Sequence, residues 1–92
     1  MLTLHPTAQF RKVYKLARKR GYNMVLLEEV LNTLLQEKPL DAKYRDHDLT
    51  GNYLGFRECH IQGDWLLIYA IDHKDLFLIA SRTGTHSDLL KK

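Results

Sequence analysis

The chain carries five histidines in 92 residues, and two of them stand four positions from an aspartate or an arginine. His60 precedes Asp64 by four residues, and His86 follows Arg82 by four residues. Because imidazole titrates near neutral pH, a histidine pair, or a histidine with a carboxylate, can remove one proton and deliver another. An arginine beside such a pair can stabilise the charge that develops on a phosphate. These residue types are the ones that metal-independent RNA cleavage by the RNA's own 2′-hydroxyl requires.

Two other kinds of site fit the same residues less well. A zinc site is disfavoured because the chain has no H-x-x-x-H pair, no cysteine pair and no second carboxylate beside Asp64. A Ser-His-Asp hydrolase is disfavoured because no nucleophile elbow is present and 92 residues leave no room for that fold. We therefore expect no metal and no cofactor. Cys59 has no cysteine partner in the chain, and we expect it to be an inert, small hydrophobic residue.

The elements that must position these side chains follow from apolar periodicity and turn residues. Apolar residues recur at three and four residue intervals over residues 10–17 and again over 27–35, and Thr7 and Asn23 precede these stretches as N-cap residues. The predicted elements are a strand over residues 1–5, helices over about 7–20 and 24–37, a loop over 38–54, strands over about 55–61, 65–71 and 76–82, and a C-terminal tail over 83–92.

These elements predict a fold class. Only two or three residues join the helices, which favours an antiparallel helical hairpin. Turn residues separate the three apolar segments after residue 54, which is typical of an antiparallel meander, and the segment 65–71 is apolar on both faces and should be the most buried. The sequence therefore predicts a single α+β domain over residues 1–92. In it a two-helix hairpin packs on a small, mainly antiparallel twisted sheet of about four strands.

Strand pairing predicts where the chemical groups meet. A hairpin closed symmetrically by residues 72–75 sets Trp65 opposite Arg82, and a hairpin closed by residues 62–64 sets His60 opposite Trp65 or Leu66. His60, Asp64, Trp65 and Arg82 should therefore gather at one end of the sheet, with His86 close enough to turn back toward it. His73 lies in the opposite turn, where we expect a solvated or structural side chain.

Positive charge is concentrated at the start of the chain. Residues 1–20 hold six basic residues and no acidic one, a charge of +6, whereas the other 72 residues hold eight basic and eleven acidic residues, a charge of −3. This distribution is expected of a chain that meets polyanions or an acidic protein partner, and a solvated basic helix face is the alternative. The six residues are Arg11, Lys12, Lys15, Arg18, Lys19 and Arg20.

The sequence also carries an expectation about location. It has no apolar run of about 18 residues and no basic segment followed by an apolar one. We therefore expect neither a membrane span nor a secretory signal, and a place in the reducing cytoplasm.

Four stretches, at residues 44–51, 55–60, 64–69 and 82–89, resemble the YafQ branch of the RelE/ParE toxin superfamily over nearly the whole chain. The most specific pieces are Asp-His at 46 and 47, Asp-Trp at 64 and 65, and Arg-Thr-Gly-Thr-His at 82–86. The resemblance implies the RelE/ParE-like fold and a ribosome-dependent mRNA endonuclease, the toxin of a type II toxin-antitoxin pair. It implies as partners a cognate antitoxin that wraps the toxin, the 70S ribosome with its A-site mRNA, and operator DNA only indirectly through the antitoxin.

Carried over position by position, the resemblance implies a catalytic set of His47, His60, Asp64, Arg82 and His86. In this interpretation His86 protonates the 5′-oxygen leaving group, His60 or Asp64 takes the 2′-hydroxyl proton, and Arg82 neutralises the phosphate. The expected substrate-binding residues are Trp65, Arg57, Lys12, Lys15, Arg18 and Lys19. This chain departs from the family near its C-terminus, where Leu90 stands in place of an aromatic residue.

Two functions of other classes remain open. A ParE-like protein uses the same architecture to inhibit a topoisomerase by protein contact and needs no acid-base set, so the clustered histidines count against it. A catalytically silent homologue that only binds its antitoxin is the second alternative, and the sequence shows no sign of lost residues. The basic helix is suited to ribosomal RNA phosphates, to an acidic antitoxin, or to both in competition.

Overall fold

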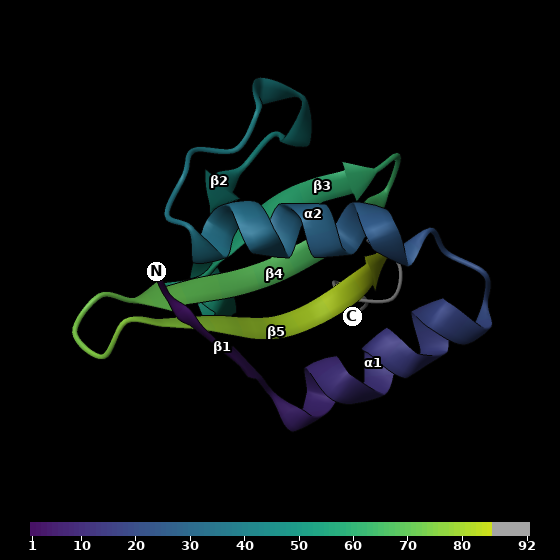
Figure 1. The fold of residues 1–92 in the computed structure, drawn as a ribbon, viewed down its shortest axis with the longest axis horizontal. Helices are drawn as coiled ribbons and strands as arrows, with labels where there is room; N and C mark the ends of the chain where they lie inside the picture. Colours follow the sequence, from purple (N-terminus) through teal and green to yellow (C-terminus); the bar gives the residue numbers. More distant parts are fainter. Residues whose placement is uncertain (86–92) are drawn as a thin grey trace.

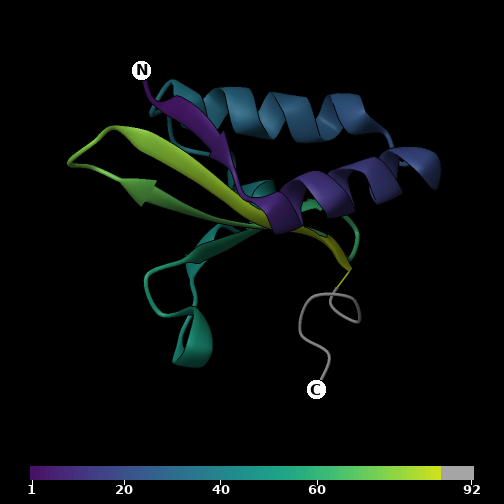
Figure 2. The ribbon, with the colours of Figure 1, turned by 90° about the horizontal axis from the view of Figure 1, so that it is seen from below.

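The computed structural model describes residues 1–85, in which two helices cover one face of a five-stranded sheet (Figures 1 and 2). The elements are β1 (Thr3–Pro6), α1 (Ala8–Lys19), α2 (Met24–Leu35), the short helix η1 (Ala42–Tyr44), β2 (His47–Asp48), the short helix η2 (Gly51–Tyr53), β3 (Arg57–Gln62), β4 (Trp65–Asp72) and β5 (Phe77–Thr85). The strand order is β1-β5-β4-β3-β2, with β1 parallel to β5 and the other neighbours antiparallel. The predicted α+β fold with a mainly antiparallel sheet is confirmed.

Both helices begin at the predicted capping residues. The Thr7 hydroxyl accepts a hydrogen bond from the Phe10 N–H at 3.0 Å, and the Asn23 side chain accepts one from the Val25 N–H at 3.3 Å. Helix α1 ends before Gly21, whose φ of +84° suits a residue without a Cβ. The helices run in opposite directions, as predicted, with α1 over β5 and β1 and α2 over β3 (Figure 1).

The sheet separates two apolar clusters. The larger one lies between the helices and the sheet, and Leu27, Leu67 and Tyr69 are among its most buried members. The smaller one lies on the other face, where Leu66 and Ile68 are covered by Leu49, Tyr53 and Phe56. Strand β4 therefore contributes side chains to both clusters, and its first five residues are all buried. This confirms that the central strand is the most buried of the sheet.

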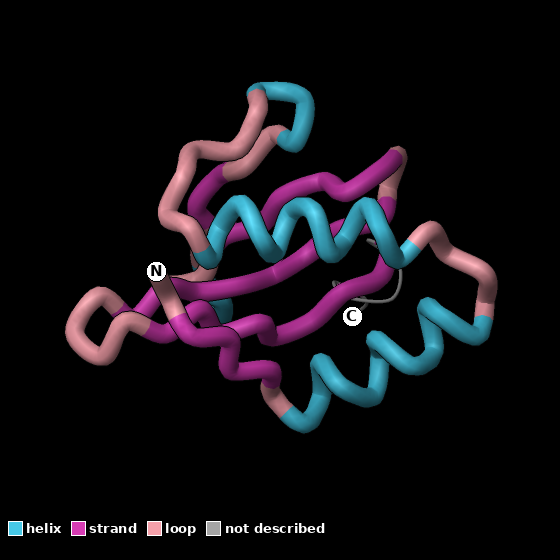
Figure 3. The backbone as a smooth tube through the Cα atoms, viewed as in Figure 1, coloured by secondary structure: helices cyan, strands magenta, loops and turns pink. Residues whose placement is uncertain are grey.

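The predicted loop over residues 38–54 contains more structure than expected (Figure 3). It holds η1, the two-residue strand β2 and η2, and β2 is the fifth strand that the predicted count of about four omitted. A strand of two residues shows no alternation of apolar and polar side chains, so its sequence carries no pattern from which to predict it. Figure 2 shows η2 on the side of the sheet opposite α1 and α2.

The predicted pairing of β4 with β5 is wrong by several residues. Asp72 pairs with Phe77 because the turn is offset: the Asp72 carboxylate accepts the N–H groups of Lys74 and Asp75 at 3.0 Å, and Leu76 takes a left-handed φ of +58°. A bulge between Ile68 and Tyr69 shifts the register once more. Arg82 therefore pairs with Ile68, not with Trp65.

The last strand is also longer than predicted. Residues 83–85, expected in the tail, continue β5 and bring Thr85 opposite Trp65. Gly84, with a φ of +152°, stays in the ladder opposite Leu66 and does not end the strand. By contrast, β3 pairs with β4 as predicted, with His60 opposite Leu66. No helix within residues 1–85 combines the length and the apolar character needed to cross a membrane.

Candidate active site

Four strands place one row of side chains across the face of the sheet that does not carry the helices. His47 pairs with Glu58, Glu58 pairs with Ile68, and Ile68 pairs with Arg82. Paired residues of antiparallel strands point to the same face, so these side chains share the face on which Ile68 is covered by η2. His60, two residues after Glu58, points to this face as well. The sheet thus brings two imidazoles, a carboxylate and a guanidinium together.

The centre of this row is the carboxylate of Glu58. Its oxygen Oε1 lies 3.4 Å from Nε2 of His47 and 3.9 Å from Nε2 of His60. The Glu58 side chain is only 4% exposed, against 49% for His47 and 15% for His60. A buried carboxylate is costly unless charged or hydrogen-bonding groups surround it. The two imidazoles are such groups, and imidazole is a side chain that commonly donates and accepts protons in catalysis.

The orientation of His47 defines which nitrogen faces the carboxylate. Its Nδ1 lies 2.7 Å from the carbonyl oxygen of Arg45, which only accepts hydrogen bonds, so Nδ1 carries a proton and donates it. The other nitrogen, Nε2, then faces Glu58. This contact is attractive only when one further proton lies on Nε2 or on the carboxyl group. His47 and Glu58 therefore form a pair that can hold a proton and release it.

His60 lies near the end of β3, and Asp64 lies in the turn between β3 and β4. Nδ1 of His60 lies 3.5 Å from the carbonyl oxygen of Gly63, so the imidazole spans from the turn to Glu58. Asp64 is the next residue of the turn, and its side chain is exposed. His60 is thus within contact distance of the acid-base row, whereas Asp64 stands in solvent at the end of the sheet.

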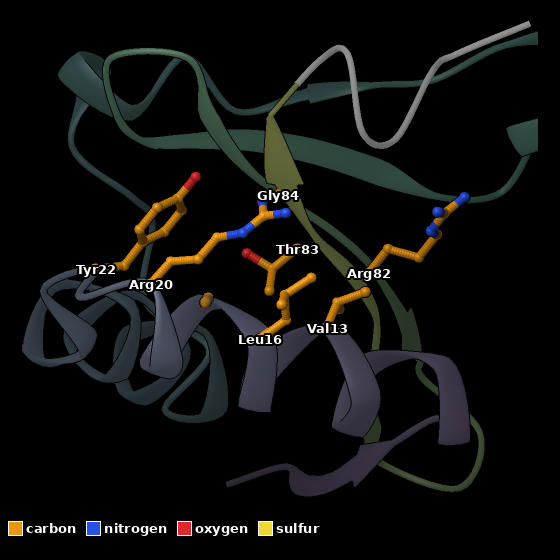
Figure 4. Close-up of a pocket in the computed structure, with 8 residues that line it drawn as sticks. Val13, Leu16, Arg20, Tyr22, Arg82, Thr83 and Gly84 are labelled. Atoms are coloured by element: carbon orange, nitrogen blue, oxygen red, sulfur yellow. The ribbon is translucent and has the colours of Figure 1, made fainter.

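Arg82 reaches the row from β5. Its Nη1 donates a hydrogen bond of 3.3 Å to the hydroxyl of Tyr53 in η2. Figure 4 shows Arg82 pointing away from α1, whereas Thr83, the next residue, points toward Val13 and Leu16 of that helix. Adjacent strands lie about 4.8 Å apart, so the backbones of Arg82 and Glu58 are roughly 10 Å apart. The guanidinium and the carboxylate thus lie on either side of the buried Ile68, on the same face of the sheet.

The expectation that Trp65 contacts substrate is corrected by its position. Trp65 begins β4 on the helix-facing side and is only 5% exposed. Its Nε1–H donates to the Thr83 hydroxyl at 2.8 Å, and its ring meets the Tyr22 ring edge-on at 4.9 Å. The indole is a core side chain, because the bulge and the length of β5 bring Thr83 beneath it. It offers no free ring face on which a base could stack.

Arg57 also differs from its predicted role. It pairs with Tyr69 across the strands, which directs its side chain to the helix side, away from Glu58 and His60. There Nη2 donates to Asp46 at 2.8 Å and Nη1 donates to Asp48 at 2.6 Å. Its guanidinium is therefore engaged by two carboxylates and does not face the substrate side of the sheet. Of the remaining predicted site residues, His86 lies outside the described residues, directly after Thr85.

The basic residues of α1 border two grooves. A groove of about 500 Å³ lies between α1 and α2, and its lining includes apolar residues together with Arg11, Lys15 and Arg18. The apolar residues are Leu4, Pro6, Phe10, Tyr14 and Leu31. Lys12 and Lys19 line another groove on a different side of the helix, with Val13 and Leu16, and Arg11 and Lys15 lie between the two grooves and line both. Arg18 is thus confined to one side of α1, and Lys12 and Lys19 to the other.

Glu58 is the residue that the prediction missed. A signal was present, since residues 58 and 60 are two apart in a strand and must share a face, and a glutamate inside an apolar strand is unusual. Within residues 1–85 no three His, Cys, Asp or Glu side chains are arranged so that they could hold a metal ion. The arrangement suits proton transfer next to a cationic group, which is the chemistry of phosphodiester cleavage.

Comparison with known proteins supports this interpretation. The chain is 40% identical over 84 residues to the mRNA interferase toxin YafQ of Escherichia coli (strain K12), covering 90% of this chain and 89% of that protein. Its structure is similar to a metal-bound toxin from Helicobacter pylori, with a TM-score of 0.91, 42% identity, and coverage of 97% of this chain and 99% of that one. It is likewise similar to YafQ in the E. coli DinJ-YafQ complex, with a TM-score of 0.87, 38% identity, and coverage of 97% and 98%.

The family itself follows from a match over almost the entire chain. The model of the bacterial toxin of type II toxin-antitoxin systems, YafQ, matches residues 2–91. The match includes the strands that carry His47, Glu58, His60 and Arg82, and it extends past the described residues to include His86. The chain therefore belongs to the YafQ family of toxins of bacterial type II toxin-antitoxin systems.

Proposed function

We propose that this chain is an mRNA interferase, an endoribonuclease that cleaves mRNA on the ribosome and acts as the toxin of a type II toxin-antitoxin pair. The observation that carries the proposal is the buried Glu58 carboxylate between His47 and His60, in one row with Arg82. The name of the E. coli relative, mRNA interferase toxin, supports the same reaction. A topoisomerase inhibitor of the ParE kind needs no such row, so the row argues against that alternative.

The proposed reaction is attack by the RNA's own 2′-hydroxyl on the neighbouring phosphorus. A bond forms between the 2′-oxygen and phosphorus and the bond to the 5′-oxygen breaks, which leaves a 2′,3′-cyclic phosphate and a 5′-hydroxyl. In our proposal the unit of Glu58 with His47 and His60 takes the 2′-hydroxyl proton, because its carboxylate and imidazoles can hold one. Arg82 neutralises the charge that grows on the phosphate, and His86 protonates the 5′-oxygen. Asp64 is an alternative acceptor of the first proton.

This scheme needs no metal ion, because proton transfer and charge neutralisation are both assigned to side chains. Removing transition metals with a chelator that leaves Mg²⁺ on the ribosome should not change the cleavage rate. Loss of cleavage, with recovery on adding back one metal, would assign part of the chemistry to that metal.

Ribosome dependence is proposed from the exposure of His47 at the edge of the sheet. The acid-base row lies on a sheet face next to an edge strand, and His47 is half exposed. Such a surface binds a flexible RNA strand in many orientations, whereas cleavage requires the 2′-oxygen, phosphorus and 5′-oxygen to lie in line. A ribosome that holds the mRNA in its A site can fix the RNA in this in-line geometry.

The direct test maps mRNA ends. Purified protein is added to ribosomes stalled on a defined message, and primer extension locates the breaks. We expect cuts within the A-site codon, with 5′-hydroxyl ends, and none in the same RNA without ribosomes.

Three single variants test the assigned residues. The cleavage rate should fall by about 10²-fold or more in each of Arg82→Ala, His60→Ala and His86→Ala. His73→Ala, in the opposite turn, is the matched control and should cut normally. Intact mRNA together with blocked DNA supercoiling would favour the topoisomerase alternative.

The groove between α1 and α2 is our proposed site for the antitoxin. An apolar floor bordered by Arg11, Lys15 and Arg18 and by one acidic residue, Glu28, has an excess of positive charge that fits an amphipathic segment with acidic side chains. The DinJ-YafQ complex shows that a YafQ protein assembles with a protein partner. The side of α1 with Lys12 and Lys19 is left for ribosomal RNA phosphates in this proposal.

A further inference from the structure

The short strand β2 carries His47 but has little backbone pairing to hold it. It consists of His47 and Asp48 alone, lies at the edge of the sheet and pairs only with Glu58 and Arg57 of β3 (Figure 1). Both residues of β2 are exposed. Two paired residues at an edge are a weak attachment, because short isolated strand pairs are marginally stable in water. Something other than the ladder must therefore fix the imidazole against Glu58.

A cluster on the other face of the sheet supplies this attachment. The carboxylate of Asp46, the residue before β2, accepts a hydrogen bond from the Tyr69 hydroxyl. It also accepts hydrogen bonds from Arg57, at 2.8 Å from Nη2 and at 3.3 and 3.4 Å from Nε. Arg57 binds Asp48 as well, at 2.6 Å from Nη1. The guanidinium thus joins the residues on both sides of His47 to β3.

Strand alternation couples this cluster to the acid-base row. Asp48, Arg57 and Tyr69 form one cross-strand row on the helix side, and His47, Glu58 and Ile68 form the next row on the open face. Each member of one row is the chain neighbour of a member of the other. The chain also turns sharply before the strand, where Arg45 takes a left-handed φ of +47° and its carbonyl oxygen accepts the His47 Nδ1–H. The contacts of Asp46 on the helix side therefore set the position of the His47 imidazole, and none of them lies on the face that carries Glu58.

The two hydrogen-bond donors of the cluster, Tyr69 and Arg57, keep their protons over a wide pH range. Burial, together with the hydrogen bond to Asp46, raises the pKa of the Tyr69 hydroxyl well above its ordinary value, so the group stays a donor. The hydrogen bond to Asp46 likewise raises the pKa of Arg57, which stays charged. The Tyr69 ring is 1% exposed and is anchored in the core below α2, so the tether starts from a rigid point.

We propose that Asp46, Arg57 and Tyr69 form a positioning clamp that holds His47 against Glu58 for proton transfer. The inference rests on the proposed cleavage function, because only then does the place of His47 matter for a rate. Asp46 and Arg57 act on the site through the residues that follow them in the chain, His47 and Glu58. Tyr69 anchors the clamp in the core. Asp48, 79% exposed, closes the clamp from the solvent side and contributes least.

The first experiment removes the anchor's hydroxyl. Tyr69→Phe keeps the buried ring and deletes only the hydrogen bond to Asp46. We expect the maximal rate of cleavage on saturating ribosome complexes to fall ten- to a hundredfold, because small displacements of a catalytic group cost about that much. The ribosome concentration at half-maximal rate should stay unchanged. Tyr44→Phe, a tyrosine of the same segment whose ring packs against the core, is the matched control and should cleave normally.

A double-mutant cycle separates positioning from a general structural role. If the clamp acts through His47, Tyr69→Phe should lower the rate in the wild-type background and have no further effect in a His47→Ala background. Equal losses in both backgrounds would overturn the proposal, as would a normal rate for Tyr69→Phe. Asp46→Asn serves as the second variant should Tyr69→Phe unfold, and it should show the same dependence on His47.

Amide hydrogen exchange tests the clamp without any cleavage assay. In Tyr69→Phe the amides of β2, and of Leu49, which donates to the Phe56 carbonyl at 2.9 Å, should exchange at least tenfold faster, while those of β4 stay protected. Unchanged exchange in β2 would refute the clamp itself. Faster exchange in β2 combined with full activity of His47→Ala would instead show that the clamp exists but that the proposed role of His47, and with it this inference, is wrong.

Discussion

At the scale of single residues, the chemistry of this protein centres on one buried glutamate. Glu58 stands between two imidazoles in the interior of β3, where a carboxylate is stable only because of its neighbours. A glutamine of the same shape fills the same space but cannot take a proton. Glu58 is therefore the residue whose substitution best separates chemistry from folding.

We expect Glu58→Gln to lower mRNA cleavage by about 10²-fold, the usual contribution of a proton-transfer group. Its thermal unfolding midpoint should be equal to or above that of the parent protein, because a buried neutral amide costs less desolvation than a carboxylate. Primer extension on stalled ribosomes and calorimetry measure the two effects. Glu29→Gln, on the exposed side of α2, is the control. Undiminished cleavage by Glu58→Gln would remove Glu58 from the mechanism.

The prediction from residue types placed His60 correctly but put Trp65 and Arg57 on the wrong face of the sheet. His60 falls opposite Leu66, one of the two partners expected, because the short Gly63-Asp64 turn limits the pairing of β3 and β4 to a few registers. Trp65 and Arg57 were expected on the substrate side, yet both face the helices. Which face a side chain takes depends on the strand register and on which face the helices cover, and neither is a property of the single residue.

At the scale of elements, helix α1 shows how one basic stretch is divided. Arg11, Lys15 and Arg18 lie along the α1–α2 groove, and Lys12 and Lys19 do not line it. Helical periodicity is the cause, since residues 11, 15 and 18 fall on one side of a helix and residues 12 and 19 on another. Arg11 and Lys15 line both grooves, so Arg18 on one side and Lys12 with Lys19 on the other are the residues that can be changed separately.

Charge reversal on the groove side should weaken antitoxin binding most. For Arg18→Glu, a basic residue that lines the α1–α2 groove and not the other one, we expect about a tenfold or greater loss of affinity for the cognate antitoxin, because electrostatic complementarity is lost. Lys12→Glu with Lys19→Glu should instead reduce ribosome binding and its salt dependence, because fewer phosphate counterions are released. Calorimetry with the antitoxin and sedimentation with ribosomes from 50 to about 200 mM salt measure both. The opposite pattern would exchange the two assignments.

The length of each strand decided whether it could be predicted. The segments that became β3 and β4 are long enough to show apolar runs, so they could be predicted to within a residue or two. Strand β2 is two residues long, and the bulge opposite Ile68 has no marker in the sequence, so neither could be predicted. The bulge moved Arg82 into the row of Glu58, and β2 brought His47 to the same row.

At the scale of the whole molecule, two groups in the core couple stability to alkaline pH. Burial, with smaller contributions from Asp46 and Glu58, raises the pKa of the Cys59 thiol to about 12, and burial also raises that of the Tyr69 hydroxyl. In the unfolded chain both groups ionise at their ordinary values, so above about pH 9 the native state binds more protons than the unfolded state. The free energy of unfolding must then fall as pH rises.

We expect urea unfolding midpoints to be insensitive to these two groups below pH 8 and to decline steadily from pH 9 upward. Cys59→Ala removes the thiol and should decline less steeply between about pH 9 and 10, even if packing loss lowers its midpoint at every pH. Chemical denaturation from pH 7 to pH 10.5 measures both curves. Parallel curves for the two proteins would contradict the raised thiol pKa.

The α+β class, the two capped helices, the buried central strand and the family could all be predicted from the sequence, because they depend on periodicity, capping residues and motifs that are local in the chain. Most of the residues with suitable chemistry could be named in the same way. Which of these residues meet depends on the packing of strands that are distant in the chain. The sheet register and the short β2 strand set His47, Glu58, His60 and Arg82 on one face, and they turned Trp65 and Arg57 to the other. Register depends on contacts between distant segments, and a bulge of one residue reverses which face a side chain takes.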